Sequence, residues 1–143
     1  MNQKENFLIK HGFDQMNFDQ VRDMLKKVFW SIDIKNEEII QGAKNSALLV
    51  GVFRSDEQIG FARVISDKTR FAYIMDVVVH EKYRLQGIGQ LMINYILSHP
   101  DLKDVYQWLL RTRDAHGVYN KAGFKQIGNP EEWMEIMHDR PQR

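Results

Sequence analysis

The residues between Asp76 and Gln90 could form a phosphate-binding site. A run of three valines ends in a polar turn, and Gly87 and Gly89 follow at the beginning of an apolar helical stripe. A strand that leads through a glycine-bearing turn into a helix offers free backbone N–H groups and the positive end of the helix dipole to an anion. These features predict that a pyrophosphate group binds where the helix begins.

The spacing of the glycines helps to decide which phosphate-containing ligand the site would bind. A dinucleotide fingerprint needs a third glycine where this chain has Met92, and a P-loop ends in Gly-Lys-Ser/Thr, a run that the sequence lacks. The remaining pattern is Arg84-x-x-Gly87-x-Gly89 after a valine-rich strand. It resembles the acetyl-CoA signature of the GNAT superfamily of N-acetyltransferases, Arg/Gln-x-x-Gly-x-Gly/Ala. A plain strand-to-helix turn with two glycines is the alternative.

A second motif supports the same resemblance. Tyr119-x-Lys121-x-Gly123-Phe124 resembles the last helix of the superfamily, in which the tyrosine serves as general acid. The two motifs stand in the family's order, with room for one helix and one strand between them. The resemblance extends from the first expected strand to Trp133. It is nearest to a bacterial subgroup of uncharacterised members and identifies no substrate.

The resemblance implies a fold and a co-substrate. The fold would be α/β, with a mixed, mostly antiparallel central sheet, a splayed fourth and fifth strand, and about four flanking helices. Residues 1–143 would form a single N-acetyltransferase domain. Acetyl-CoA would bind through the main chain beside the splay and at the helix start, with added charge from the arginine. The implied cofactor-binding residues are Val77, Val78, Val79, Arg84, Leu85, Gln86, Gly87, Ile88, Gly89 and Gln90.

Acyl transfer to an amine poses two proton problems. An alkylammonium group has a reference pKa of about 10.4, so freeing its lone pair near pH 7 costs roughly 4–5 kcal/mol. The leaving thiolate must also be protonated, and the resemblance assigns that step to Tyr119. Asp76, an acidic residue inside a valine-rich strand, is the candidate base; a carboxylate paired with a basic side chain is its other interpretation. Asp114 is expected to cap the last helix, and His116 is a base or a surface residue.

Two residues depart from the family pattern. His80 stands where proline is common, and Leu85 stands where glycine is common. Neither removes a backbone N–H from the expected anion site, so the expectation of acetyl-CoA binding is kept. Leu85 would narrow the approach of the adenosine end.

Periodicity and turn residues predict the elements around these motifs. Asn17 and Gln20 have the spacing of a capping box before an apolar helical stripe that runs to Phe29, and a second helix begins near Asn36. A third follows Gly87. The last covers Asp114–Ala122, with Gly123 after its end. Strands are expected at Phe7–Lys10, Ala47–Phe53, Ile59–Ile65, Phe71–Val79 and Val105–Leu110, with a final antiparallel pair at Phe124–Ile127 and Trp133–His138.

Composition narrows the class of protein. Twenty basic and nineteen acidic side chains give a net charge of +1 without a basic stripe, which argues against nucleic acid as a partner. No apolar run is long enough for a membrane span and no signal peptide is recognised, so a cytoplasmic protein is expected. With no cysteine, an acetyl-cysteine intermediate is impossible and direct transfer is expected. The histidines lack metal-ligand spacing, so no metal is expected.

The sequence therefore favours an acetyl-CoA-dependent N-acetyltransferase acting on a primary amine, free or on a protein, whose identity stays open. One alternative is a non-catalytic acyl-CoA-binding sensor on the same fold. Another is a nicotinamide or flavin dinucleotide-binding module. The family resemblance also makes a homodimer an expectation.

Overall fold

A mixed sheet forms the centre of the molecule. The computed structural model describes residues 6–142, and within them the strands follow the order β1-β2-β3-β4-β5. The first four strands are antiparallel neighbours, whereas β4 and β5 are parallel because a whole helix separates them. The strands are β1 (Phe7–His11), β2 (Leu48–Arg54), β3 (Glu57–Ser66), β4 (Phe71–Val79) and β5 (Gln107–Leu109).

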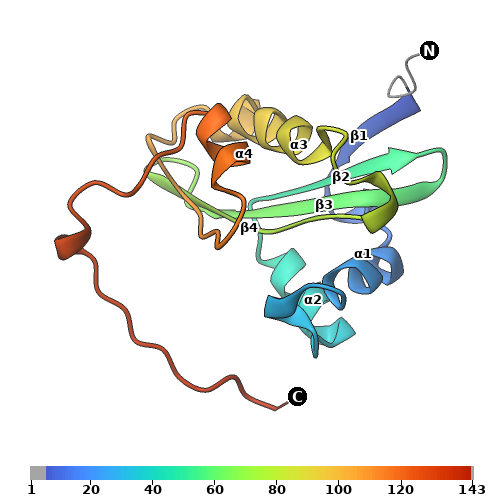
Figure 1. Cartoon of the computed structure of the whole chain (residues 1–143), viewed down its shortest axis with the longest axis horizontal. Coiled ribbons are helices and arrows are strands. Elements are labelled where there is room, and N and C mark those ends of the chain that lie inside the picture. The colour runs from blue at the N-terminus through green and yellow to red at the C-terminus, as the bar shows by residue number, and fades with distance from the viewer. Residues whose placement is uncertain (1–5, 143) are drawn as a thin grey trace.

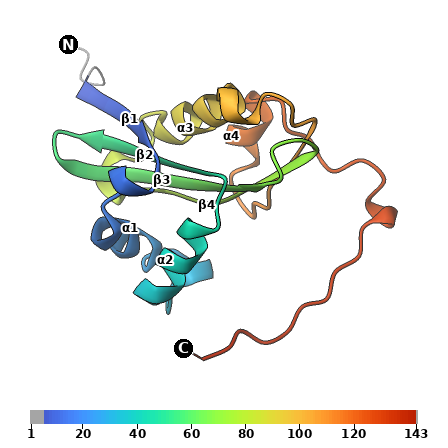
Figure 2. The same cartoon turned by 180° about the vertical axis from the view of Figure 1, so that it is seen from behind.

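Helices cover both faces of this sheet. Figures 1 and 2 show α1 and α2 on one face, and α3 and α4 on the other. Each face has its own apolar core, one centred on α3 and one centred on α1 and α2. This architecture confirms the predicted α/β fold with a mostly antiparallel sheet. The helices are α1 (Phe18–Leu25), α2 (Asn36–Lys44), α3 (Ile88–Leu97) and α4 (His116–Lys121), with 3-10 turns at Phe13–Gln15, Phe29–Ser31, Glu81–Tyr83, Pro100–Leu102 and Pro130–Glu132.

The start of α1 is half of a capping box. The Asn17 side chain accepts a hydrogen bond from the Gln20 amide at 3.1 Å, as the spacing predicts. Gln20 does not reach back to Asn17, however. The buried side chain of Gln58 on β3 accepts from the Asn17 amide at 2.7 Å, and Gln20 accepts from the Gln58 amide at 2.7 Å. The helix start is thus tied to the beginning of β3 by a partner distant in sequence.

Several predicted boundaries were wrong. The helix α1 ends at Leu25, where the Ser31 hydroxyl donates to the Leu25 carbonyl, so the apolar stripe to Phe29 overestimated its length. The strand β5 is shorter than Val105–Leu110, because its pairing with β4 begins at Gln107 and ends at Leu109.

The predicted final strand pair is not present. Residues 124–127 form no strand, and the chain turns at Asn129, whose φ is +54°, into the short helix Pro130–Glu132. Beyond it, residues 133–142, the C-terminal arm, form no helix or strand; the arm first runs outward from the sheet and then returns toward α2 (Figures 1 and 2). The predicted pairing of 133–138 with 124–127 was wrong, because strand pairing also depends on where the turn between the two segments sends the chain.

The turn between β3 and β4 makes a testable prediction about pH. The Asp67 carboxylate accepts backbone hydrogen bonds from Thr69, Arg70 and Phe71, and these bonds hold the pKa of Asp67 well below its usual range. A carboxyl with a lowered folded-state pKa contributes stability above its unfolded pKa, about 4, and that contribution is lost as the pH falls. We expect Asp67→Asn to lower the urea midpoint at pH 7 and to lower it less at pH 3. An equal difference at both pH values would contradict the assignment, and Asp56→Asn in the preceding hairpin turn is the control.

Candidate active site

The strands β4 and β5, at one end of the strand order, separate partway along β4. Their pairing covers Phe71–Tyr73 of β4 and stops at the pair Tyr73 and Leu109, although β4 continues to Val79. Residues 74–79 of β4 therefore have no partner in β5, and the main-chain groups on that edge are available to a ligand. The fourth and fifth strands are therefore splayed, as predicted, and Val77, Val78 and Val79 lie along the opening between them.

The loop that follows β4 carries the expected anion site. Within residues 6–142, no protein acceptor pairs with the backbone N–H groups of residues 85–90. Gly87 is the N-cap of α3 and adopts the left-handed conformation, with φ +80° and ψ 12°. Ile88 is buried and anchors the first turn, while Gly87 is exposed. The helix dipole and these free amides together suit a phosphate group.

The two departures from the family pattern have local explanations. Leu85 has φ +63° and a fully exposed side chain, so it holds the left-handed conformation that glycine adopts at lower cost. His80 caps the short helix Glu81–Tyr83, because its Nδ1 accepts from the Lys82 amide at 3.1 Å. Arg84 donates from Nε to the Val79 carbonyl at 3.2 Å, which ties the loop to the end of β4.

Gly89 offers a test of ligand contact that is separate from folding. A Cβ added at Gly89 meets no atom within 4 Å, and Gly89 has no left-handed φ. We expect Gly89→Ala to leave the melting temperature unchanged or slightly higher, since alanine favours helices over glycine by about 1 kcal/mol. It should weaken acetyl-CoA binding about tenfold, because the methyl group would enter the space of the phosphate. Calorimetric titration measures this, and unchanged affinity would contradict phosphate binding here.

A cavity of about 600 Å³ lies beside the open part of the splay. Its lining includes Asp76 of β4, the candidate base, and Tyr119 of α4, the candidate acid, which are far apart in the sequence. Val77 of β4 lies beside them. Trp30 contributes from the 3-10 turn after α1. Phe29 of the same turn also lines the cavity, and the remaining wall comes from β4 and from the segment that follows β5, namely Tyr73, Ile74, Met75, Arg111, Thr112, Arg113, Asp114 and Ala115.

Tyr119 is positioned by the end of its own helix. Gly123, with φ +103°, lets the Phe124 amide donate to the Tyr119 carbonyl and the Gly123 amide donate to the Asn120 carbonyl, each at 3.0 Å. This Schellman arrangement brings the Phe124 ring edge-on to the Tyr119 ring, with centroids 6.1 Å apart. Burial raises the pKa of the Tyr119 hydroxyl above its usual value of about 10. The hydroxyl therefore keeps its proton at neutral pH, as a general acid must.

Asp76 is paired with a basic side chain. It occupies an irregularity in β4 opposite Ala62 and has φ +56°. Its Oδ2 accepts from Nε of Arg63 at 2.7 Å, with side chains that are 13% and 16% exposed, respectively. The paired-carboxylate interpretation of Asp76 is thus present in the structure, and its role as a base stays a prediction. Arg63 also lies against Gly42 of α2, where an added Cβ would be 3.3 Å from the guanidinium carbon.

A smaller cavity of about 190 Å³ continues from Asp76 toward α2. Glu38 of α2 lines it, and Arg140 of the C-terminal arm reaches Glu38 with an N–O distance of 2.8 Å. Trp30 borders both this cavity and the larger one. Sequence patterns did not identify Arg63 or Arg140 as members of the site, because both contacts join residues far apart in the chain.

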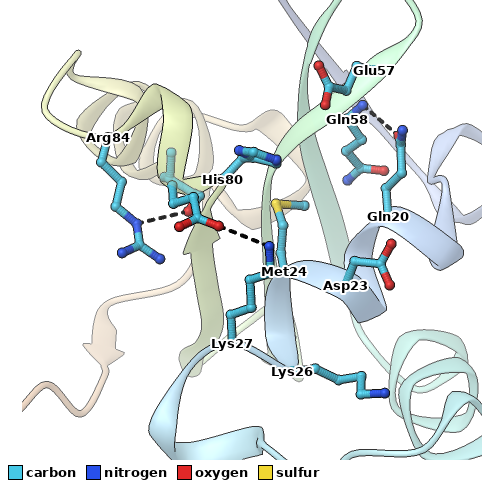
Figure 3. Close-up of a pocket in the computed structure, with 11 residues that line it drawn as sticks. Gln20, Asp23, Met24, Lys26, Lys27, Glu57, Gln58, His80 and Arg84 are labelled. Atoms are coloured by element: carbon cyan, nitrogen blue, oxygen red, sulfur yellow. Dashed lines mark hydrogen bonds and ion pairs between the residues drawn. The ribbon is translucent and has the colours of Figure 1, made fainter.

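A third cavity, of about 360 Å³, lies between α1 and the end of β4 (Figure 3). Lys27, two residues after the end of α1, donates to Glu81 at 2.9 Å, and this bond lowers the pKa of the Glu81 carboxyl. Lys26 and Arg84 add positive charge, and Asp23 adds negative charge. Val79 and Arg84, which also line this cavity, belong to the predicted acetyl-CoA motif, whereas no sequence motif pointed to the residues of α1 that face them.

The last helix differs in detail from its prediction. It begins at His116 rather than Asp114, and its N-cap residue, Ala115, has no side-chain cap. The Thr112 hydroxyl instead accepts from the Ala115 amide at 3.0 Å, so the prediction that Asp114 caps the helix was wrong. His116 is exposed, in keeping with a surface residue.

The fold and the site together define an acetyl-transfer domain, and comparison with known proteins gives its family. The sequence profile of the Acetyltransferase (GNAT) domain matches residues 44–126, which is more than half of the chain. The protein therefore belongs to the GNAT acetyltransferase family.

Individual relatives agree with this assignment. A protein of Xanthomonas campestris pv. campestris assigned to the GNAT family has a crystal structure that superposes with a TM-score of 0.86 at 29% identity, covering 92% of this chain and 93% of that one. A predicted acetyltransferase of Clostridium acetobutylicum, solved with acetyl-CoA, shares the fold with a TM-score of 0.70 at 17% identity, covering 94% and 99%. The uncharacterized N-acetyltransferase ycf52 of Gracilaria tenuistipitata var. liui is 33% identical over 59% of this chain, and the match spans 43% of that relative.

Two further properties concern the described residues as a whole. None of the helices within residues 6–142 has the length and apolar character needed to cross a membrane. The same residues contain no group of three or more His, Cys, Asp or Glu side chains that could hold a metal ion.

Proposed function

We propose that this protein transfers an acetyl group from acetyl-CoA directly to a primary amine. The observation that carries the proposal is the continuity of the site. Unpaired amides at residues 85–90 lead to an unpaired edge of β4, and that edge borders the cavity that holds Tyr119. A linear ligand with a pyrophosphate group at one end and a thioester at the other matches this sequence of features. The C. acetobutylicum neighbour, solved with acetyl-CoA, supports the choice of donor.

The residues of the cavity suit the two proton transfers. The amine nitrogen attacks the thioester carbonyl, the C–S bond breaks, and the leaving thiolate takes the proton of the Tyr119 hydroxyl. Burial raises the pKa of that hydroxyl and so keeps the proton available for the step. Asp76 takes the proton that the acceptor's ammonium group must lose before its nitrogen can attack. Arg63 fixes the orientation of the Asp76 carboxylate through the 2.7 Å contact.

The lining of the smaller cavity favours a cationic acceptor. Asp76 is neutralised by Arg63, whereas the charge of Glu38 is met by Arg140, a residue of the extended arm. A guanidinium group bound to Glu38 shows that this carboxylate accepts a cation at that position. Trp30 and Ile34 supply apolar surface for a methylene chain beside it. We therefore propose an amine acceptor with a positive charge, and no nucleic acid or membrane partner.

The experiment is an amine panel of free amino acids, polyamines and lysine peptides, read out by release of the CoA thiol. Turnover with at least one amine, together with a rise in melting temperature when acetyl-CoA is added, is the expected result. A rise in melting temperature with no turnover on any amine would favour a non-catalytic acyl-CoA sensor. No rise with acetyl-CoA would exclude both functions.

A further inference from the structure

The larger cavity has a buried floor and an exposed rim. Phe29 and Trp30, in the 3-10 turn after α1, are 50% and 46% exposed. Arg113, in the segment between β5 and α4, is exposed as well. The part of the cavity that lies on β4 is far less accessible, since Ile74 is 2% exposed and the Asp76 side chain is 13% exposed. Solvent therefore reaches the cavity past the aromatic and cationic side chains of the rim.

The two sides of this rim are in contact. The guanidinium carbon of Arg113 lies 3.6 Å from the centroid of the Phe29 ring, which is a cation–π contact. The Trp30 ring meets the Phe29 ring edge-on, with centroids 5.1 Å apart. Among the described residues, no carboxylate forms an ion pair with Arg113. The stack of Arg113, Phe29 and Trp30, the rim stack, therefore joins the turn after α1 to the segment after β5.

The turn that carries the two aromatic rings is anchored at its base. The Ser31 hydroxyl is buried and donates to the Leu25 carbonyl, which fixes the turn against the end of α1. Phe29, Trp30 and Ile32 are exposed, so burial in the core does not fix the positions of their side chains. The contact across the rim therefore decides where the two aromatic rings lie.

Water that enters this cavity competes with the amine. Under the proposed function, the thioester of acetyl-CoA lies in the cavity beside Tyr119. A water oxygen that attacks the thioester carbonyl breaks the C–S bond and yields acetate, the CoA thiol and a proton. A general acid that protonates the leaving thiolate assists attack by water as well as attack by an amine. Hydrolysis is therefore limited by keeping water out, and apolar rings held over the rim do so.

We propose that Arg113 is a positioning residue: through its contact with Phe29 it holds the rim stack closed over the larger cavity and keeps water from the thioester until an amine enters. This inference rests on the proposed acetyl transfer. A cation–π contact between exposed side chains is weak, so the rim can open for the acceptor in each turnover. The stack also sets the position of Trp30, which borders the smaller cavity that Glu38 lines.

The first experiment measures release of the CoA thiol from acetyl-CoA when no amine is present. We expect Arg113→Ala to hydrolyse acetyl-CoA about threefold faster than the wild type or more, the size expected when one exposed cation–π contact is lost. Arg113→Lys keeps a cation beside the ring and should restore most of the protection. Lys10→Ala is the matched control, because it removes a cation 4.7 Å from the Phe53 ring, outside the cavity, and should hydrolyse at the wild-type rate. Hydrolysis by Arg113→Ala at the wild-type rate, no protection by Arg113→Lys, or equally fast hydrolysis by Lys10→Ala would each overturn the proposal.

The second experiment separates this role from binding of acetyl-CoA. Phe29→Leu should raise hydrolysis as much as Arg113→Ala, and the double variant should raise it no further, because both changes remove the same contact. Calorimetric titration should give every variant the wild-type dissociation constant of acetyl-CoA, and circular dichroism checks that each one folds. Additive effects on hydrolysis, or weaker acetyl-CoA binding by Arg113→Ala, would overturn the proposal.

The same measurements distinguish failure of this inference from failure of the proposed function. The hydrolysis assay contains no amine, so it tests the rim stack whether or not any amine is acetylated. A wild type that binds acetyl-CoA and transfers its acetyl group, with Arg113→Ala no faster in hydrolysis, contradicts the role of Arg113 alone. A wild type that does not bind acetyl-CoA contradicts both.

Discussion

Tyr119→Phe should lower kcat by about 100-fold or more, because a general acid typically contributes between 100- and 10,000-fold. The substitution removes the hydroxyl and keeps the ring that packs edge-on against Phe124. The Schellman end of α4 depends on backbone bonds, so the helix should be unaffected. We therefore expect the dissociation constant of acetyl-CoA and the melting temperature to change little.

The control for this prediction is Tyr106→Phe, since Tyr106 is 74% exposed and does not line the larger cavity. It should retain wild-type kcat. Steady-state kinetics with the best amine of the panel, together with calorimetric binding of acetyl-CoA, separate the chemical step from binding. A Tyr119→Phe enzyme with wild-type kcat would exclude the hydroxyl as the acid, and loss of acetyl-CoA binding would assign Tyr119 to the binding surface.

The features that could be predicted from the sequence are those that depend on neighbouring residues. Gly87 and Gly123 have positive φ in turns whose positions their flanking patterns mark, and Asn17 bonds the amide three residues later. Such contacts lie within one turn of chain, so a short window of sequence specifies them. The alternation of apolar residues likewise placed the first four strands to within about two residues of their observed ends.

The features that could not be predicted join distant parts of the chain. Gln58 completes the start of α1 from 41 positions away, and Arg63 neutralises Asp76 across two adjacent strands. Nothing near Asp76 in the sequence distinguishes a paired carboxylate from a base. The prediction of a strand at 133–138 was wrong for the same reason: the composition of a segment favours a strand without specifying which part of the chain would pair with it.

Asp76→Ala should destabilise the folded protein by about 3 kcal/mol, because it leaves the guanidinium of Arg63 partly buried without its carboxylate. Arg63 keeps its weaker contacts with the Gly42 carbonyl at 3.4 Å and the Ser46 hydroxyl at 3.3 Å, which sets the loss near the lower end of the usual range. Arg63→Met should cost a similar amount. The double variant should lose less than the sum, since removing both charges leaves neither one buried and unpaired.

Urea unfolding of the four proteins in this cycle measures the coupling free energy, which we expect to be about 2 kcal/mol. The matched control is the pair Lys27 and Glu81, whose contact of 2.9 Å is similarly short but whose side chains are each 58% exposed. Water screens that pair, so its cycle should give less than about 1 kcal/mol. Equal coupling in both cycles would mean that burial does not strengthen the contact between Arg63 and Asp76.

Asp76→Asn separates the effect on stability from the effect on catalysis. The asparagine keeps an acceptor for Arg63 but cannot take a proton. The loss of kcat/KM in this variant should therefore be smaller at higher pH, where more of the amine is already neutral.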